Sequence, residues 1–141
     1  MTSRVLLAAL AGTVVYFVYG FVSEGLVIRK EFAPYSAVYR SPESLKPVMP
    51  IGFLATFVAI LVMACMYAKG YEGGGPSEGL RFGALVAVFV VCTVVAHSYV
   101  ILNIGGRLAA ALAVSNLIQW TLVGLVISLV YGRGAIGHAA R

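Results

Sequence analysis

The sequence has few charged residues and no aspartate. Charged residues make up 11% of its 141 residues, all five acids are glutamates, and hydrophobic residues make up 61%. A soluble domain contains about 25% charged residues and about 45–50% apolar ones. The composition therefore excludes an ordinary soluble domain and indicates an integral membrane protein.

Cysteine and histidine are also scarce. Cys65 and Cys92 belong to no C-x-x-C motif, and the sequence has only two histidines. This pattern argues against covalent haem, an iron–sulfur cluster and structural zinc. The two thiols are expected at membrane depths that differ by about 10 Å, too far apart for a disulfide. We predict neither a cofactor nor a metal.

The charges that are present divide the chain into four apolar stretches. Uncharged blocks cover 5–23, 47–68, 82–106 and 108–132, and a helix crosses the hydrocarbon core with roughly 20 residues. The first block continues into a longer apolar run than the roughly 7–15 residues typical of a signal peptide. The sequence predicts one domain over 1–141, an all-α integral membrane four-helix bundle with short loops. The spans are predicted near 4–28, 48–69, 79–102 and 106–132.

The net charge of +5 is explained by basic residues that flank the predicted membrane spans. All ten basic residues lie at block ends or in loops, where they contact phosphate head groups, so we predict a lipid bilayer as partner and no nucleic acid. Four spans place Arg4, Lys69, Arg81, Arg133 and Arg141 on one face, and Arg29, Lys30, Arg40, Lys46 and Arg107 on the other. This even split does not fix the orientation; we favour both termini in the cytoplasm.

The longest loop has features of an ordered interfacial segment. Ser41 followed by Pro42 and Glu43 is typical of a helix start, with a capping hydroxyl and proline in the first turn. Phe32 and Tyr39 make the same loop rich in aromatic residues, as expected at the membrane surface. The short segment 103–106 predicts a tight turn that makes the third and fourth spans antiparallel neighbours.

Polar residues inside the spans are the main functional signal, because each is costly in lipid and tends to face the bundle interior. The candidate polar intramembrane cluster consists of Tyr16, Glu24, Thr93, His97, Asn116 and Gln119. Matched depths place Glu24 and His97 near the same membrane face. Asn116 and Gln119 are predicted to face protein. The cluster is either hydrogen-bonding glue between helices or a proton-linked or ligand-binding site that includes Glu24 and His97.

Small residues spaced by four recur on every span and permit close helix contact. These pairs are Ala8 with Gly12, Ala55 with Ala59, Gly83 with Ala87, and Ala109 with Ala113. They suit packing within one bundle and packing against a second copy equally well.

Several short motifs carry a resemblance to a known group of proteins. They are YRSPE at 39–43, KP at 46–47, MP at 49–50, YAKGYEGG at 67–74 and EGLRFG at 78–83. With these motifs the whole chain resembles small four-helix bacterial inner-membrane proteins of a family of unknown function. The resemblance implies a bacterial origin, a multi-pass protein of the inner membrane and four spans, and it implies no activity or site residue.

The functional hypotheses follow from this sparse chemistry. The sequence favours a non-enzymatic integral membrane protein, either a homo-oligomer or an accessory subunit of a larger membrane assembly. The alternative is a small transporter or channel protomer with a polar intramembrane site. An enzyme is disfavoured, because a catalyst needs a grouping of acids, bases or nucleophiles and the spans contain one acid and one histidine.

Overall fold

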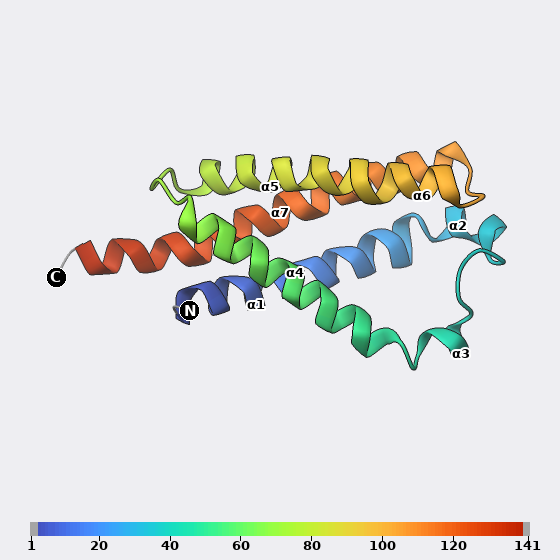
Figure 1. Ribbon diagram of the computed structural model, residues 1–141, viewed down its shortest axis with the longest axis horizontal. Coiled ribbons are helices and arrows are strands. Elements are labelled where there is room, and N and C mark those ends of the chain that lie inside the picture. The colour runs from blue at the N-terminus through green and yellow to red at the C-terminus, as the bar shows by residue number, and fades with distance from the viewer. Residues whose placement is uncertain (1–2, 140–141) are drawn as a thin grey trace.

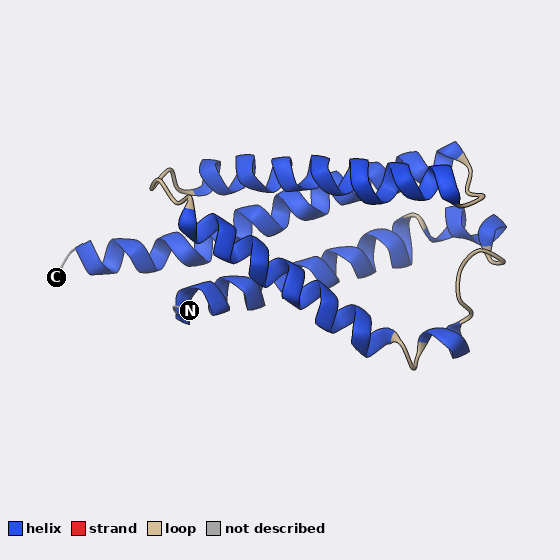
Figure 2. Ribbon diagram, viewed as in Figure 1, coloured by secondary structure: helices blue, strands red, loops and turns tan. Residues whose placement is uncertain are grey.

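The computed structural model describes residues 3–139, with side chains described through Gly132. Helices account for most of this range, and residues 3–139 contain no strand (Figure 2). The helical elements are α1 (Ser3–Val22), η1 (Ser23–Val27), α2 (Arg29–Phe32), η2 (Ala33–Tyr35), α3 (Pro42–Leu45), α4 (Met49–Lys69), α5 (Pro76–Val90), η3 (Val91–Val95), α6 (Ala96–Ile101) and α7 (Gly106–Ala139). The predicted all-α fold class is confirmed.

Four helical stretches are long and apolar enough to cross a membrane. They run over Ser3–Val27, Met49–Lys69, Pro76–Ile101 and Gly106–Gly132, close to the predicted spans. The first described residue and the end of α7 lie at the same end as the loop between α4 and α5 (Figure 1). We call this the terminal end and the opposite one the cap end. Residues 1–2 and 140–141 of the predicted domain lie outside the described range, and the side chain of Arg133 lies outside it as well.

The bundle is packed most tightly at its terminal end. Helix α1 packs on both α4 and α7, while α5 lies along α7 and α4 crosses α1 obliquely (Figure 1). The core combines Val5, Ala8 and Ala9 of α1, Ile60, Met63, Ala64 and Tyr67 of α4, and Val123 and Ile127 of α7. No residue from 49 to 59 is buried, and in the first half of α4 only the partly buried Phe57 packs against this core.

Three glycines allow α5 and α7 to touch through their backbones. A Cβ atom added at Gly83 would lie 2.8 Å from the carbonyl oxygens of both Trp120 and Thr121. A Cβ atom added at Gly124 would lie 2.6 Å from the Gly79 carbonyl oxygen. Small residues at helix interfaces permit such close approach in membranes. The contact extends the predicted pair of Gly83 and Ala87 and adds Gly79 and Gly124 to it.

A carboxylate orders the loop at the terminal end. Glu78 Oε1 accepts a hydrogen bond from the Glu72 amide at 3.0 Å, and Oε2 accepts one from the Gly74 amide at 2.7 Å. Gly73 and Gly75 have positive φ angles of 83° and 63°, a conformation that glycine adopts without steric cost. The loop therefore needs both its glycines and the acid that begins α5.

The cap end is formed by the segment between η1 and α4. Ser41 is the N-cap of α3, its hydroxyl accepting from the Ser44 amide with Pro42 in the first turn, so the predicted helix start is confirmed. Glu31 in α2 forms a salt bridge of 2.9 Å with Arg107 at the start of α7. The exposed Arg107 limits the stability gained from this pair, but the pair connects α2 to the fourth span.

Candidate functional site

Two spans change from α-helix to π-helix near the cap end. In η1 the Ile28 amide donates to the Ser23 carbonyl at 2.8 Å, and in η3 the Ala96 amide donates to the Val91 carbonyl. Both are the i to i+5 bonds of a π turn. Single π turns within α-helices are rare and are often found at functional sites. Hydropathy carries no signal for them.

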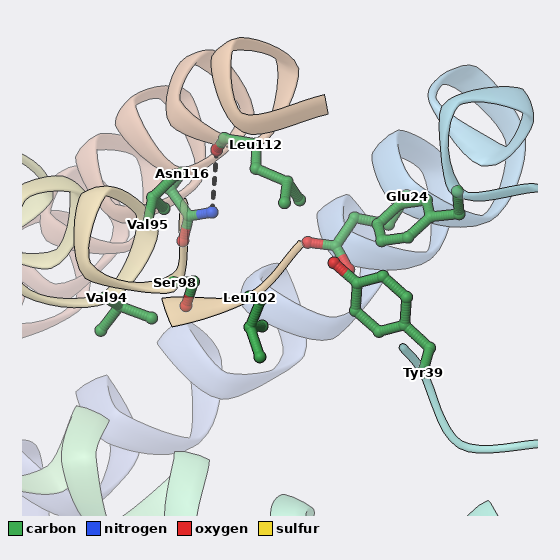
Figure 3. Close-up of a pocket in the computed structure, with 9 residues that line it drawn as sticks. Glu24, Tyr39, Val94, Val95, Ser98, Leu102, Leu112 and Asn116 are labelled. Carbon is green, nitrogen blue, oxygen red and sulfur yellow. Dashed lines mark hydrogen bonds between the residues drawn. The ribbon is translucent and has the colours of Figure 1, made fainter. Parts of the chain in front are cut away.

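Both π segments line one cavity of about 240 Å³. It is bounded by η1, α2, the segment after η2, η3, α6 and α7 (Figure 3). The lining residues are Glu24, Phe32, Tyr39, Val94, Val95, Ser98, Leu102, Leu112 and Asn116. We call this the Glu24 cavity. Polar side chains from three spans therefore meet at one place in an otherwise apolar wall.

The polar groups of the Glu24 cavity are one carboxylate, one amide and the hydroxyls of Ser98 and Tyr39. Glu24 forms no salt bridge with any residue that the structure describes. Asn116 uses its Nδ2 to donate to the Leu112 carbonyl at 2.9 Å, and its Oδ1 lies beside the cavity (Figure 3). No Lys, Arg or His lines the wall. The cavity thus combines an uncompensated carboxylate with an amide oxygen.

Tyr39 brings an aromatic ring and a hydroxyl to the carboxylate. Its hydroxyl points toward the Glu24 carboxylate (Figure 3), and its ring packs edge-to-face on Phe32 with centroids 5.2 Å apart. Burial and, to a smaller degree, the negative charge of Glu24 raise the pKa of Tyr39 above its ordinary value. The loop side chain is therefore within electrostatic reach of the carboxylate.

Gln119 and Tyr16 lie together, away from this cavity. Gln119 is 2% exposed and donates from Nε2 to the Tyr16 carbonyl oxygen at 2.8 Å. Gly20 leaves room for the amide, since a Cβ atom there would lie 3.1 Å from Nε2. The Tyr16 ring packs on Trp120 at a centroid distance of 5.2 Å. This pair links α1 to α7 in the manner of interhelical glue.

Thr93 and His97 are placed apart from the rest of the predicted cluster. Thr93 is exposed and donates to the Phe89 carbonyl of its own helix at 2.7 Å. His97 is exposed and does not line the Glu24 cavity, and the described residues contain no ion pair between it and Glu24. Glu24 and Asn116 are brought to one cavity, whereas His97 belongs to a different face of α6.

Sequence reasoning missed three residues of the cavity as site residues. Ser98 lies beside His97 in the sequence, but only Ser98 lines the cavity. The reason is the π turn before it, whose extra residue rotates every later side chain relative to an uninterrupted helix. Phe32 and Tyr39 were assigned only to an interfacial loop. Their aromatic character was the available signal, but nothing in the sequence showed that the loop folds back over η1.

A second pair of polar residues is satisfied internally. Ser23 and Ser115 are both buried, and their hydroxyls lie 2.7 Å apart in a hydrogen bond between η1 and α7. They line a neighbouring cavity with Tyr19 and apolar residues. Because these two hydroxyls are already hydrogen-bonded to each other, this cavity offers a ligand fewer free polar groups than the Glu24 cavity does.

The fold and its cavity define a multi-pass membrane protein with four helices suited to cross the bilayer. Among the residues that the structure describes, no group of three or more His, Cys, Asp or Glu side chains could hold a metal ion. No family model, curated protein or solved structure matches the chain. Its function must therefore be argued from the cavity itself.

Proposed function

We propose that this protein is a non-enzymatic membrane protein that binds a small molecule in the Glu24 cavity, as a small transporter or channel protomer would. The observation that carries the proposal is the convergence of Glu24, Ser98 and Asn116 from three spans on one cavity. A carboxylate facing a cavity within a membrane-spanning segment is costly, and such residues commonly mark substrate or ion pathways.

Binding fits the lining better than catalysis does. The wall holds a single carboxylate, and no histidine, lysine or cysteine lies beside it to complete an acid–base or nucleophilic pair. Its remaining polar groups are hydroxyls and one amide, which orient a ligand by hydrogen bonding. Apolar walls with a few placed polar groups are typical of ligand sites.

We expect a membrane-soluble carbodiimide, dicyclohexylcarbodiimide, to modify Glu24 in the intact protein in lipid. The reagent partitions into apolar regions and reacts with carboxyl groups it can reach there. Glu24 lies within the first span, whereas Glu43 lies in α3, outside the four spans. Peptide mass spectrometry identifies the modified residue. Ser98→Trp fills the cavity and is expected to suppress the reaction.

The matched control is Tyr99→Trp, on the next position of α6 and outside the cavity lining. Its side chain is exposed, so the modification of Glu24 should continue as in the unaltered protein. Glu24 left unmodified, or modified equally in the Ser98→Trp variant, would contradict a ligand-accessible cavity.

We infer, second, that the protein self-associates through the first half of α4. Gly52, Ala55 and Ala59 share one helix face, all three are exposed, and a Cβ atom at Gly52 would meet nothing within 4 Å. In a membrane, small residues favour close helix packing. The face is therefore suited to the same face of a second copy.

Disulfide crosslinking tests this association. In a background with Cys65 and Cys92 replaced by alanine, Ala55→Cys should give a crosslinked dimer in lipid, whereas Leu54→Cys, about 100° around the helix, should not. Native mass in mild detergent should show two or more copies. One copy bound to foreign chains, without an Ala55→Cys dimer, would refute self-association and favour the accessory-subunit role.

The bacterial inner membrane is our proposed location. Four apolar helices support a multi-pass membrane protein, and the choice of membrane rests on the resemblance to the bacterial family of unknown function. Fractionation of bacterial membranes after expression of the chain checks this placement.

A further inference from the structure

The charge of the Glu24 cavity selects its ligand. Glu24 supplies a negative charge, Asn116 contributes its side-chain amide, and no cationic side chain lines the wall. An anionic ligand would meet an uncompensated carboxylate. A ligand carrying a positive charge would neutralise it.

The shape and chemistry of the wall disfavour a metal ion. Ca²⁺ takes about 6–8 oxygen ligands, and Mg²⁺ demands an octahedral shell, whereas Glu24 is the only carboxylate that lines the cavity. Much of the wall consists of valine and leucine side chains, which favour an apolar body on the ligand. The ligand should therefore be organic.

Two aromatic rings complete the site. Phe32 and Tyr39 line the same cavity as the carboxylate and pack edge-to-face on each other. Aromatic faces attract organic cations, and cages of aromatic residues recognise quaternary ammonium groups. The cavity of about 240 Å³ lies below the range of about 300–1,000 Å³ typical of drug-sized ligands, which limits the ligand to a small molecule.

We propose that the Glu24 cavity binds a small organic cation of the quaternary-ammonium type, with Glu24 as its counter-ion and Phe32 and Tyr39 as its aromatic wall. This inference rests on the proposed function and adds the chemical class of the ligand. The loop that carries Tyr39 closes one side of the cavity and completes the site only when it folds over η1.

Calorimetry on the purified full chain in lipid nanodiscs tests the proposal with a pair of probes of nearly equal shape. Phenyltrimethylammonium carries the cation, and tert-butylbenzene is its neutral counterpart. We expect saturable binding of the cation. Glu24→Gln should weaken it by at least about tenfold, equal to about 1.4 kcal/mol, and Glu24→Asp should retain part of the affinity because it keeps the charge.

The aromatic wall is tested separately from the charge. Tyr39→Phe keeps the ring and should bind phenyltrimethylammonium nearly as the unaltered protein does, whereas Tyr39→Ala should lose affinity severalfold. Glu43→Gln is the matched control, because it removes an exposed glutamate of the segment between η1 and α4 that lies outside the cavity. It should leave the affinity unchanged. Circular dichroism melts establish that each variant is folded.

The outcomes separate this inference from the proposed function. Equal binding of the two probes, unaffected by Glu24→Gln but abolished by Ser98→Trp, would overturn the cation class and leave a ligand-binding cavity. Absence of cation binding with Glu24 still modified by the carbodiimide would also overturn the cation class alone. Absence of both binding and modification would overturn the proposed function together with this inference.

Discussion

Replacing Gly124 with alanine is expected to destabilise the bundle strongly, because the added methyl group would meet the backbone of α5. A Cβ atom there would lie 2.6 Å from the Gly79 carbonyl oxygen and 2.7 Å from the Gly83 amide nitrogen. Both are backbone atoms, so no side-chain rotation relieves the contact. Overpacking typically costs about 1–3 kcal/mol, and we expect Gly124→Ala at the upper end of that range and Gly124→Leu beyond it.

Gly106→Ala is the matched control for this substitution. It adds the same methyl group at an exposed position at the start of α7, where nothing lies within 4 Å, so its free energy of unfolding should stay within about 0.5 kcal/mol of the unaltered protein. Unfolding in a titration of denaturing detergent can be followed by the fluorescence of Trp120, the only tryptophan. Equal stability of the two variants would mean that α5 and α7 lie farther apart than the structure shows.

Replacing Gln119 with glutamate is expected to cause the second large loss of stability. Gln119 is buried and donates to the Tyr16 carbonyl. An ionised glutamate there cannot donate, and a charged side chain at the centre of a span costs about 3 kcal/mol. The loss of stability caused by Gln119→Glu should become smaller as the pH falls, because the protonated carboxyl can again donate a hydrogen bond to the carbonyl of Tyr16.

Gln119→Met separates the charge from the hydrogen bond. Methionine is of similar length and replaces the amide with an uncharged thioether. It loses the hydrogen bond without adding a charge, so it should cost about 0.6 kcal/mol, the average for an interhelical hydrogen bond in a membrane. Detergent unfolding at two pH values compares the variants. A glutamate variant as stable as the methionine variant at neutral pH would show that position 119 is open to water.

The tightly packed core and the Glu24 cavity lie at opposite ends of the bundle. The residues that pack most tightly, from Ile60 to Tyr67 and around Gly83 and Gly124, lie at the terminal end. The Glu24 cavity lies at the cap end, where the first half of α4 has no fully buried residue. Regions with few buried contacts open at lower free energy. The cap end is thus the place where the bundle can admit a ligand at least cost to its fold.

The spans could be predicted because the charges alone delimit them. Arg4, Lys69, Arg81 and Arg107 lie at or near span ends, and the helix start at Ser41 was predicted from the hydroxyl and the proline after it. The pairing of the helices could not be predicted. Every face of these spans is apolar, so hydrophobic periodicity does not distinguish the side of α7 that receives α5 from the side that receives α1.

The site was predicted only in part, for reasons that depend on particular residues. Glu24 and Asn116 were identified from the cost of placing polar groups in lipid. The assignment of His97 rested on depth along the helix, which gives no angle around it, and η3 alters that angle for every later residue. Tyr39 was missed because its place depends on how the cap segment folds over η1.

The central claim is that four spans place the Glu24 cavity at the membrane face opposite the chain termini. Single cysteines tested with a membrane-impermeant thiol reagent measure it most directly, in a background with Cys65 and Cys92 replaced by alanine. Ser3→Cys and Glu72→Cys, at the terminal end, should react from one side of sealed vesicles, and Ser36→Cys, in the exposed turn after η2, from the other. Reaction of Ser36→Cys from the same side as Ser3→Cys would contradict the account.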